Sequence, residues 1–116
     1  MIGRGLATLA FLMMAGETSA ADLSSGRSTA KSHCAVCHGV DGIAKIPIAP
    51  HLAGESRAYL ETQLKAFKHG KREHEIMSVI AADLSTDEIK NVSAWYSAIE
   101  ISVSVPELEE DAEKAE

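Results

Sequence analysis

The chain has 116 residues, a formal net charge of −6 at pH 7 and only 4% aromatic residues. This length allows one small domain, and a domain with so few aromatic side chains builds a modest core that usually needs a disulfide, a metal or a cofactor. The negative charge argues against nucleic-acid binding, because no basic surface dominates to release counterions from phosphates.

Residues 1–21 have the anatomy of a secretory signal. Arg4 precedes an apolar run at residues 6–15, and small residues follow up to Ala21. We expect cleavage near Ala20 or Ala21 and a periplasmic mature protein. An uncleaved anchor is the alternative, although the run is shorter than the roughly 20 residues of a membrane span. No later segment is apolar enough to cross a bilayer, so we expect no membrane span in the mature chain.

The first helix is predicted over residues 23–38. Gly26 within it costs about 1 kcal/mol relative to alanine. Either another helix packs closely against this glycine, or the first turn of the helix frays. The glycines and prolines of residues 39–54 then predict a loop.

Two further helices follow. Ser56 can cap the second helix, Gly70 ends it, and its apolar residues share one face: Leu60, Leu64 and Phe67. Ser85 and Glu88 predict a capping box for the third helix. Its apolar stripe consists of Ile89, Val92, Tyr96 and Ile99. Nothing between residues 22 and 100 clearly indicates a sheet.

Residues 101–116 form an extension. The stretch ISVSVP at 101–106 alternates apolar and polar residues as a strand does, but the chain has no obvious partner strand. We expect it to pack on the domain as an extended segment; the alternative is that it adds a strand to a partner's sheet. Residues 107–116 carry five glutamates and one aspartate against Lys114, which predicts a solvated, disordered acidic tail.

The only two cysteines form a C-x-x-C pair in the stretch SHCAVCHGVDG, residues 32–42. Three chemistries use such a pair. A redox dithiol needs a βαβ setting, whereas these flanks are helical and loop-like. A structural zinc site needs four ligands, so His38 and one further histidine would have to join the cysteines: His33, His51, His69 or His74. The third possibility is c-type haem, whose attachment signature is C-x-x-C-H.

The haem interpretation has a geometric basis, and we favour it. Cys34 and Cys37 are three residues apart on a helix, so both side chains reach one face and can form thioethers with two porphyrin vinyl groups. His38 follows immediately and can bind the iron. One covalent haem c would use both cysteines. Its attachment outside the bacterial cytoplasm agrees with the export signal.

The second axial position of the iron has one favoured ligand. Met77 is the only methionine of the predicted mature chain, and it lies between the second and third helices. Its thioether would complete His/Met ligation, which raises the reduction potential and suits electron transfer. The alternative role for a lone methionine is core filling. His74 is the competing ligand, and bis-histidine ligation would lower the potential.

These motifs occur in the order found in a known family, and the chain resembles the small bacterial class I cytochromes c, both single-domain monohaem carriers and the halves of dihaem carriers. The resemblance rests on CAVCHG, PHLAG at residues 50–54, YLETQLKAFKHGKR at 59–72, Met77 and LSTDEIKNVSAWYSAI at 84–99. It implies an all-α, cytochrome c-like fold of three to five short helices around a covalently attached haem. The cytochrome domain would occupy residues 22–100.

The resemblance also implies roles for single residues. Pro50 resembles the proline whose carbonyl accepts a hydrogen bond from the iron-binding imidazole. Gly26 resembles the glycine over which the last helix crosses, with Trp95 or Tyr96 packed at the crossing. Arg72 is similar to a basic residue that neutralises a haem propionate, or else it is simply solvated. Tyr59 and Leu60 would line the haem pocket.

In function, the resemblance implies a one-electron carrier between redox partner proteins, and not an enzyme. One alternative is a haem c subunit of a periplasmic dehydrogenase complex, held through residues 101–116. Another is a haem enzyme or gas sensor with an open sixth position. Four basic residues either steer an acidic partner, bind the acidic tail or form a solvated face: Lys65, Lys68, Lys71 and Arg72.

Overall fold

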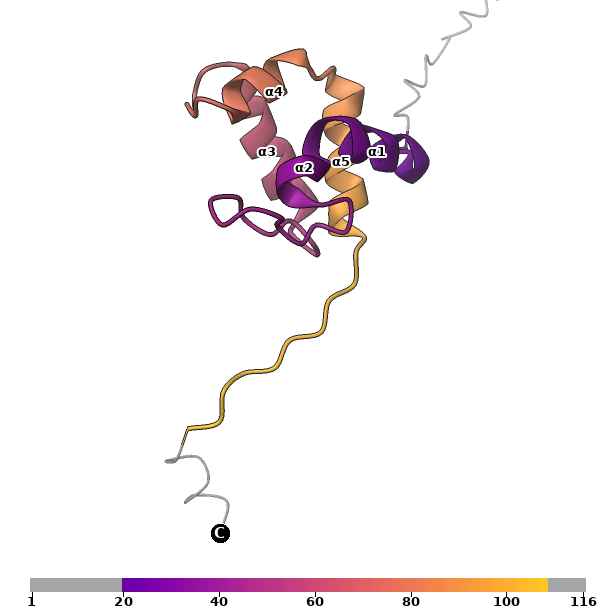
Figure 1. Cartoon of the computed structure of the whole chain (residues 1–116). Helices are drawn as coiled ribbons and strands as arrows, with labels where there is room; N and C mark the ends of the chain where they lie inside the picture. Colours follow the sequence, from indigo (N-terminus) through magenta and orange to yellow (C-terminus); the bar gives the residue numbers. More distant parts are fainter. Residues whose placement is uncertain (1–19, 109–116) are drawn as a thin grey trace, which may run out of the picture.

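The computed structural model describes residues 20–108, and every regular element in that range is helical. The elements are α1 (Leu23–Thr29), the π-helical turn η1 (Ala30–Cys34), α2 (Ala35–His38), α3 (Arg57–Lys68), α4 (Met77–Asp83) and α5 (Thr86–Ser97). Figure 1 shows them gathered into one body, in which α5 packs against both α1 and α3. The predicted all-α fold class is confirmed for this part of the chain.

Most of the predicted signal peptide, residues 1–19, and the end of the acidic tail, residues 109–116, lie outside the described residues. Within 20–108, none of the helices combines the length and the apolar character that a bilayer span requires.

The first three elements run without a break from Leu23 to His38, the extent predicted for one helix. Asp22 begins this run, because its side chain accepts hydrogen bonds from the backbone N–H groups of Ser24 and Ser25. The sequence pattern did not predict the π-helical turn η1, which lies in the middle of the run. Such turns are frequent at functional sites, and this one ends at Cys34, the first cysteine of the C-x-x-C-H motif.

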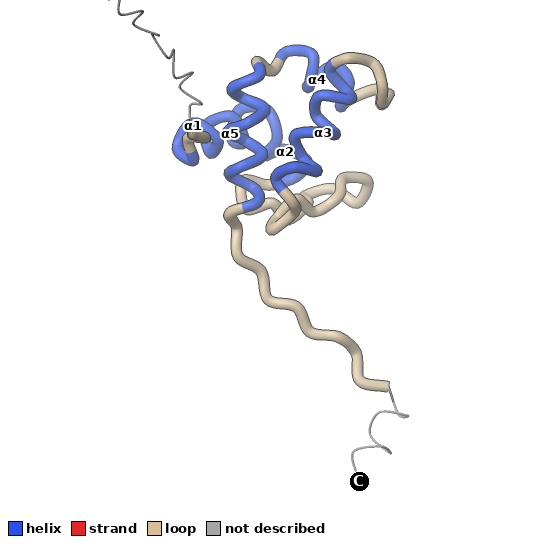
Figure 2. The backbone as a smooth tube through the Cα atoms, turned by 180° about the vertical axis from the view of Figure 1, so that it is seen from behind, coloured by secondary structure: helices blue, strands red, loops and turns tan. Residues whose placement is uncertain are grey.

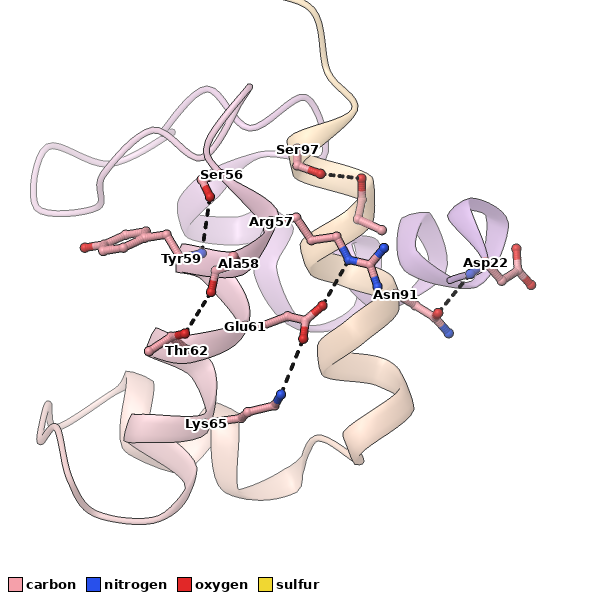
Figure 3. Close-up of polar contacts among 11 residues, drawn as sticks. Asp22, Ser56, Arg57, Ala58, Tyr59, Glu61, Thr62, Lys65, Asn91 and Ser97 are labelled. Atoms are coloured by element: carbon pink, nitrogen blue, oxygen red, sulfur yellow. Dashed lines mark hydrogen bonds and ion pairs between the residues drawn. The ribbon is translucent and has the colours of Figure 1, made fainter. Parts of the chain in front are cut away.

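The crossing of α1 over α5 depends on Gly26. A Cβ at this buried glycine would collide with the backbone carbonyl of Asn91 and lie 3.0 Å from Cβ of Trp95. Beside the crossing, the backbone N–H of Asp22 donates to Asn91 Oδ1 at 2.9 Å (Figure 3). The predicted close packing at Gly26 is therefore confirmed, with Trp95 at the crossing, and the frayed first turn is wrong.

The second predicted helix is present as α3. The Ser56 hydroxyl oxygen accepts a hydrogen bond from the Tyr59 backbone N–H, and Gly70, with φ of +73°, follows the last turn. Leu60 and Phe67 are buried as predicted. On another side of the helix, Glu61 accepts from Arg57 at 3.0 Å and from Lys65 at 3.3 Å, as Figure 3 shows.

The connection after α3 contains α4, a short helix absent from the pattern-based description. Met77 is its first residue and was predicted only to lie in a connection. The helix has seven residues, and the position before it is Ile76 in place of a typical capping residue, so the local pattern is weak. Lys68 Nζ holds its other end by donating to the carbonyls of Ala82 and Leu84 at 2.9 and 2.6 Å.

The third predicted helix is α5, and both bonds of its capping box between Ser85 and Glu88 are present. It supplies more buried apolar residues than any other described helix. Val92 and Tyr96 pack with Ala30 and Leu60 in the central cluster, and Ile99 packs against this cluster just beyond the end of the helix.

The extension does not pack on the domain, so that expectation is wrong beyond its first residue. Residues 101–108 form neither helix nor strand and run away from the helices (Figures 1 and 2). Ile101 lies beside Gly54, but Val103 and Val105 are 79% and 80% exposed. An alternating segment gains stability by pairing its backbone with a sheet edge, and the described part of the chain contains no strand that could pair with it.

Replacing Gly26 by alanine tests the helix crossing. We expect Gly26→Ala to lower the free energy of unfolding by about 2 kcal/mol, because its Cβ meets rigid backbone and overpacking typically costs about 1–3 kcal/mol. Denaturant unfolding of the haem-loaded protein measures the change. The control is Ser24→Ala on the same helix, which is exposed and should change stability by less than about 0.5 kcal/mol. Equal effects of the two substitutions would contradict the crossing as described.

Candidate haem-binding site

A cavity of about 410 Å³ opens between α2, α3, α4, α5 and the loop at residues 39–56. Ligand pockets in proteins commonly span about 300–1,000 Å³. All the residues predicted from the sequence to form the haem site line this cavity: Cys34, Cys37, His38, Pro50, Tyr59, Arg72 and Met77. The structure thus brings the whole predicted set together, while the role of each residue toward haem stays a prediction.

Both cysteines are free thiols that are half buried at the cavity wall. Burial raises the pKa of the Cys34 thiol to about 11, against the opposing effect of its hydrogen bond with Tyr96, so this thiol is neutral at pH 7. A thioether is neutral too and suits this desolvated position. Within residues 20–108, no group of three or more histidine, cysteine or acidic side chains is placed to hold a metal ion, so the zinc alternative has no support in this part of the chain.

His38 ends α2 and is buried. Its Nδ1 lies 2.9 Å from the carbonyl oxygen of Pro50. Because a carbonyl oxygen can only accept, Nδ1 carries the proton and donates, which leaves the lone pair of the neutral ring on Nε2. The hydrogen bond expected from the family pattern is therefore present, and it leaves one ring nitrogen able to bind iron.

Two neighbouring aromatic residues of α5 fix the segment that follows His38. The Tyr96 hydroxyl donates to the carbonyl of Gly39, and Trp95 Nε1 donates to the carbonyl of Val40, both at 2.8 Å. The sequence pattern indicates only a packing role for these two side chains. It does not reveal the hydrogen bonds because they join residues 55 and 57 positions apart, beyond the range of local patterns.

The Arg72 side chain is exposed, but it contacts two neighbouring side chains. Its Nη1 donates to Gln63 Oε1 at 2.7 Å, and its guanidinium lies 4.6 Å from the centre of the Phe67 ring. All three side chains line the cavity. Arg72 is therefore held at the cavity wall and is not simply solvated, and the neutralisation of a propionate stays a prediction.

Ser93 is a further residue of the site that local sequence patterns do not indicate. It lines the cavity from α5 at 1% exposure, and its hydroxyl has no hydrogen-bond partner in the described part of the protein. An unpaired buried hydroxyl costs on the order of 1–3 kcal/mol. Together, the neutral Cys34 thiol, the available lone pair of His38 and the mainly apolar walls fit a large, mainly apolar cofactor such as haem.

Two of the basic residues near the end of α3 already have partners within the domain. Lys65 pairs with Glu61, and Lys68 donates to the carbonyls at the end of α4. These contacts weaken the case for a free positive docking patch. The described part of the extension also leaves α5 beyond Ser97, at the end of the domain away from Lys65 (Figure 3), and so runs away from this patch.

Comparison with known proteins gives consistent matches. The sequence family described as cytochrome C oxidase, cbb3-type, subunit III, matches residues 21–95. Cytochrome c-554(548) from Halomonas halodenitrificans is 40% identical over 58% of this chain and 84% of its own length. A thiosulfate dehydrogenase electron acceptor from Stutzerimonas stutzeri is 36% identical over 81% of this chain and 46% of its own.

The solved structures agree with these matches. Reduced recombinant cytochrome c4 from Pseudomonas stutzeri has a TM-score of 0.65 and 31% identity, covering 72% of this chain and 48% of that one. The chain therefore spans less than half of the thiosulfate dehydrogenase acceptor and of the cytochrome c4, but most of cytochrome c-554(548). From the match over residues 21–95 and the likeness to cytochrome c-554(548), the chain belongs to the family of bacterial c-type cytochromes, which bind haem c covalently.

Proposed function

We propose that this protein is a one-electron carrier with a single covalent haem c, and that His38 and Met77 are the axial ligands of its iron. One observation carries the proposal: Cys34, Cys37, His38 and Met77, which come from two distant parts of the sequence, line one cavity. Relatives named cytochrome c4 and thiosulfate dehydrogenase electron acceptor support a role in electron transfer.

Each residue has a distinct task in this proposal. When bound, haem c supplies an iron that accepts and releases one electron. Cys34 and Cys37 anchor it by thioethers. The Pro50 carbonyl fixes the tautomer and orientation of His38 and raises the basicity of its ring. Met77 contributes a thioether, which raises the reduction potential.

Residues of the cavity wall and of the surface have the remaining roles, which are to exclude water and to let a partner approach. Leu60, Phe67 and Val92 are buried apolar residues of the wall and exclude water. Val36, between the two cysteines, is 86% exposed, so the attachment segment reaches the surface, where a redox partner can approach. Export follows from the sequence pattern: we propose that residues 1–21 are removed and that residues 22–100 form the cytochrome domain in the periplasm.

A second candidate function is that of haem c subunit in a dehydrogenase complex. The observation that favours it is the extension, whose apolar side chains at Val103 and Val105 are largely exposed and alternate as a strand does. An exposed segment with this alternation can add as a strand to the sheet edge of a partner. One relative is named as the cytochrome subunit of sulfide dehydrogenase and is 35% identical over 54% of this chain.

The single covalent haem is tested on the exported protein. We expect the mass of the mature polypeptide, begun near Asp22, to exceed its amino-acid mass by one haem, and an optical redox titration to follow a one-electron curve. A mass equal to that of the polypeptide alone, with both thiols free, would refute the proposal.

The role of Met77 is tested by Met77→Ala. We expect the low-spin ferric spectrum to lose its sulfur-to-iron charge-transfer band and the reduction potential to fall, because the thioether ligand is gone. Val79→Ala is the matched control, since Val79 is exposed on the same helix and should leave both properties unchanged. A high-spin wild type whose reduced form readily binds carbon monoxide would instead favour a haem enzyme or gas sensor.

Removal of residues 101–116 separates the two candidate functions. For a free carrier, we expect the spectrum, the potential and the exchange of electrons with partners to stay unchanged, because the described extension barely touches the domain. For a complex subunit, co-purification with the dehydrogenase would be lost. Replacing Val103 and Val105 by serine is the finer variant, and it should reproduce that loss if the apolar side chains make the contact.

A further inference from the structure

We propose that His74 is a positioning residue for Met77, holding the first turn of α4, and is not itself an iron ligand. This inference rests on the proposed His/Met ligation. The sequence left His74 and Met77 as rivals for one coordination position, and both line the cavity. Their hydrogen bonds give them complementary tasks.

The His74 ring caps the first turn of α4. Its Nδ1 accepts hydrogen bonds from the backbone N–H groups of Ile76 and Met77, each at 3.2 Å. In the opposite direction, the His74 backbone N–H donates to Ser78 Oγ at 3.0 Å, and the Ser78 backbone N–H donates to the His74 carbonyl at 3.0 Å. Histidine and serine thus make a reciprocal cap around the residue that bears the thioether.

Helix α4 depends on such a cap. Helix starts leave several N–H groups without an intrahelical partner, and a seven-residue helix gains little from its own cooperativity. Without the imidazole, the first turn would fray, and Met77 is the first residue of that helix. At the other end, Lys68 holds the last carbonyls. Side chains from outside the helix therefore fix both ends of the element that carries Met77.

The same bonds oppose a ligand role for His74. A ring nitrogen that accepts two N–H groups carries no proton, so the proton of the neutral imidazole lies on Nε2. Neither nitrogen then keeps a free lone pair, which coordination to iron requires. The ring also lies edge-on to Phe67, with centres 6.5 Å apart. Turning it toward an iron would break the cap and release Met77 from its position.

The experiment measures how readily added imidazole displaces the axial sulfur of the haem-loaded ferric protein, followed by loss of the charge-transfer band. We expect His74→Ala to raise the apparent affinity for imidazole about fivefold or more, in line with the loss of a helix cap. His74→Asn, which keeps a short acceptor at the cap position, should stay within about twofold of wild type. Ser78→Ala removes the reciprocal bond and should also raise the affinity.

His69→Ala is the matched control, because His69 is an exposed histidine of the same region that does not line the cavity, and it should behave as wild type. Wild-type affinity for imidazole in both His74→Ala and Ser78→Ala would overturn the inference, as would failure of asparagine to restore it. A low-spin spectrum that survives Met77→Ala but is lost in His74→Ala would make His74 the ligand. A wild type without the band would refute the proposed His/Met ligation itself, so the two failures are distinguishable.

Discussion

The arrangement of the helices follows from the close contact between α1 and α5. The two helices approach so closely that only a glycine fits at position 26, against the Asn91 carbonyl and Trp95. The contact directs the helical run that ends in the cysteine motif. One turn later, Trp95 and Tyr96 of α5 bind the carbonyls that follow His38. A single helix thus holds the cysteine-bearing segment at its beginning and at its end.

This arrangement explains how a domain with few aromatic residues keeps two proposed axial ligands in place. His38 is fixed by the Pro50 carbonyl on its ring and by the Tyr96 hydroxyl on the neighbouring Gly39. Met77 is fixed through α4, which His74 and Lys68 hold at opposite ends. Ligands that are held before the electron arrives move little when the charge on the iron changes, which is the property a carrier needs.

The cations and the apolar residues of the surface differ in whether they contact the rest of the domain. Two cations near the end of α3 bind groups of the domain itself. Lys65 forms an ion pair with Glu61 of the same helix, and Lys68 donates to the carbonyls at the end of α4. Apolar groups remain exposed where the cysteine segment reaches the surface, at Val36, and along the extension, at Val103 and Val105. In the proposed function, these two apolar places, and not a free basic patch, are the surfaces that would contact a redox partner.

The local features could be predicted from the sequence. The C-x-x-C-H motif, the caps at Ser56 and Ser85, the glycine at position 70 that follows α3 and the apolar stripes each depend on residues within a few positions of one another, so their spacing was sufficient to predict them. The position of Pro50 against His38 was available only through the family resemblance. Tertiary structure alone decided the π-helical turn at Ala30–Cys34, the short helix at Met77, the bonds from Trp95 and Tyr96, and the exposed course of the extension. The physical reason is that these features depend on contacts between residues far apart in the chain, or on the lack of a surface to pack against, and neither leaves a periodic trace in the sequence.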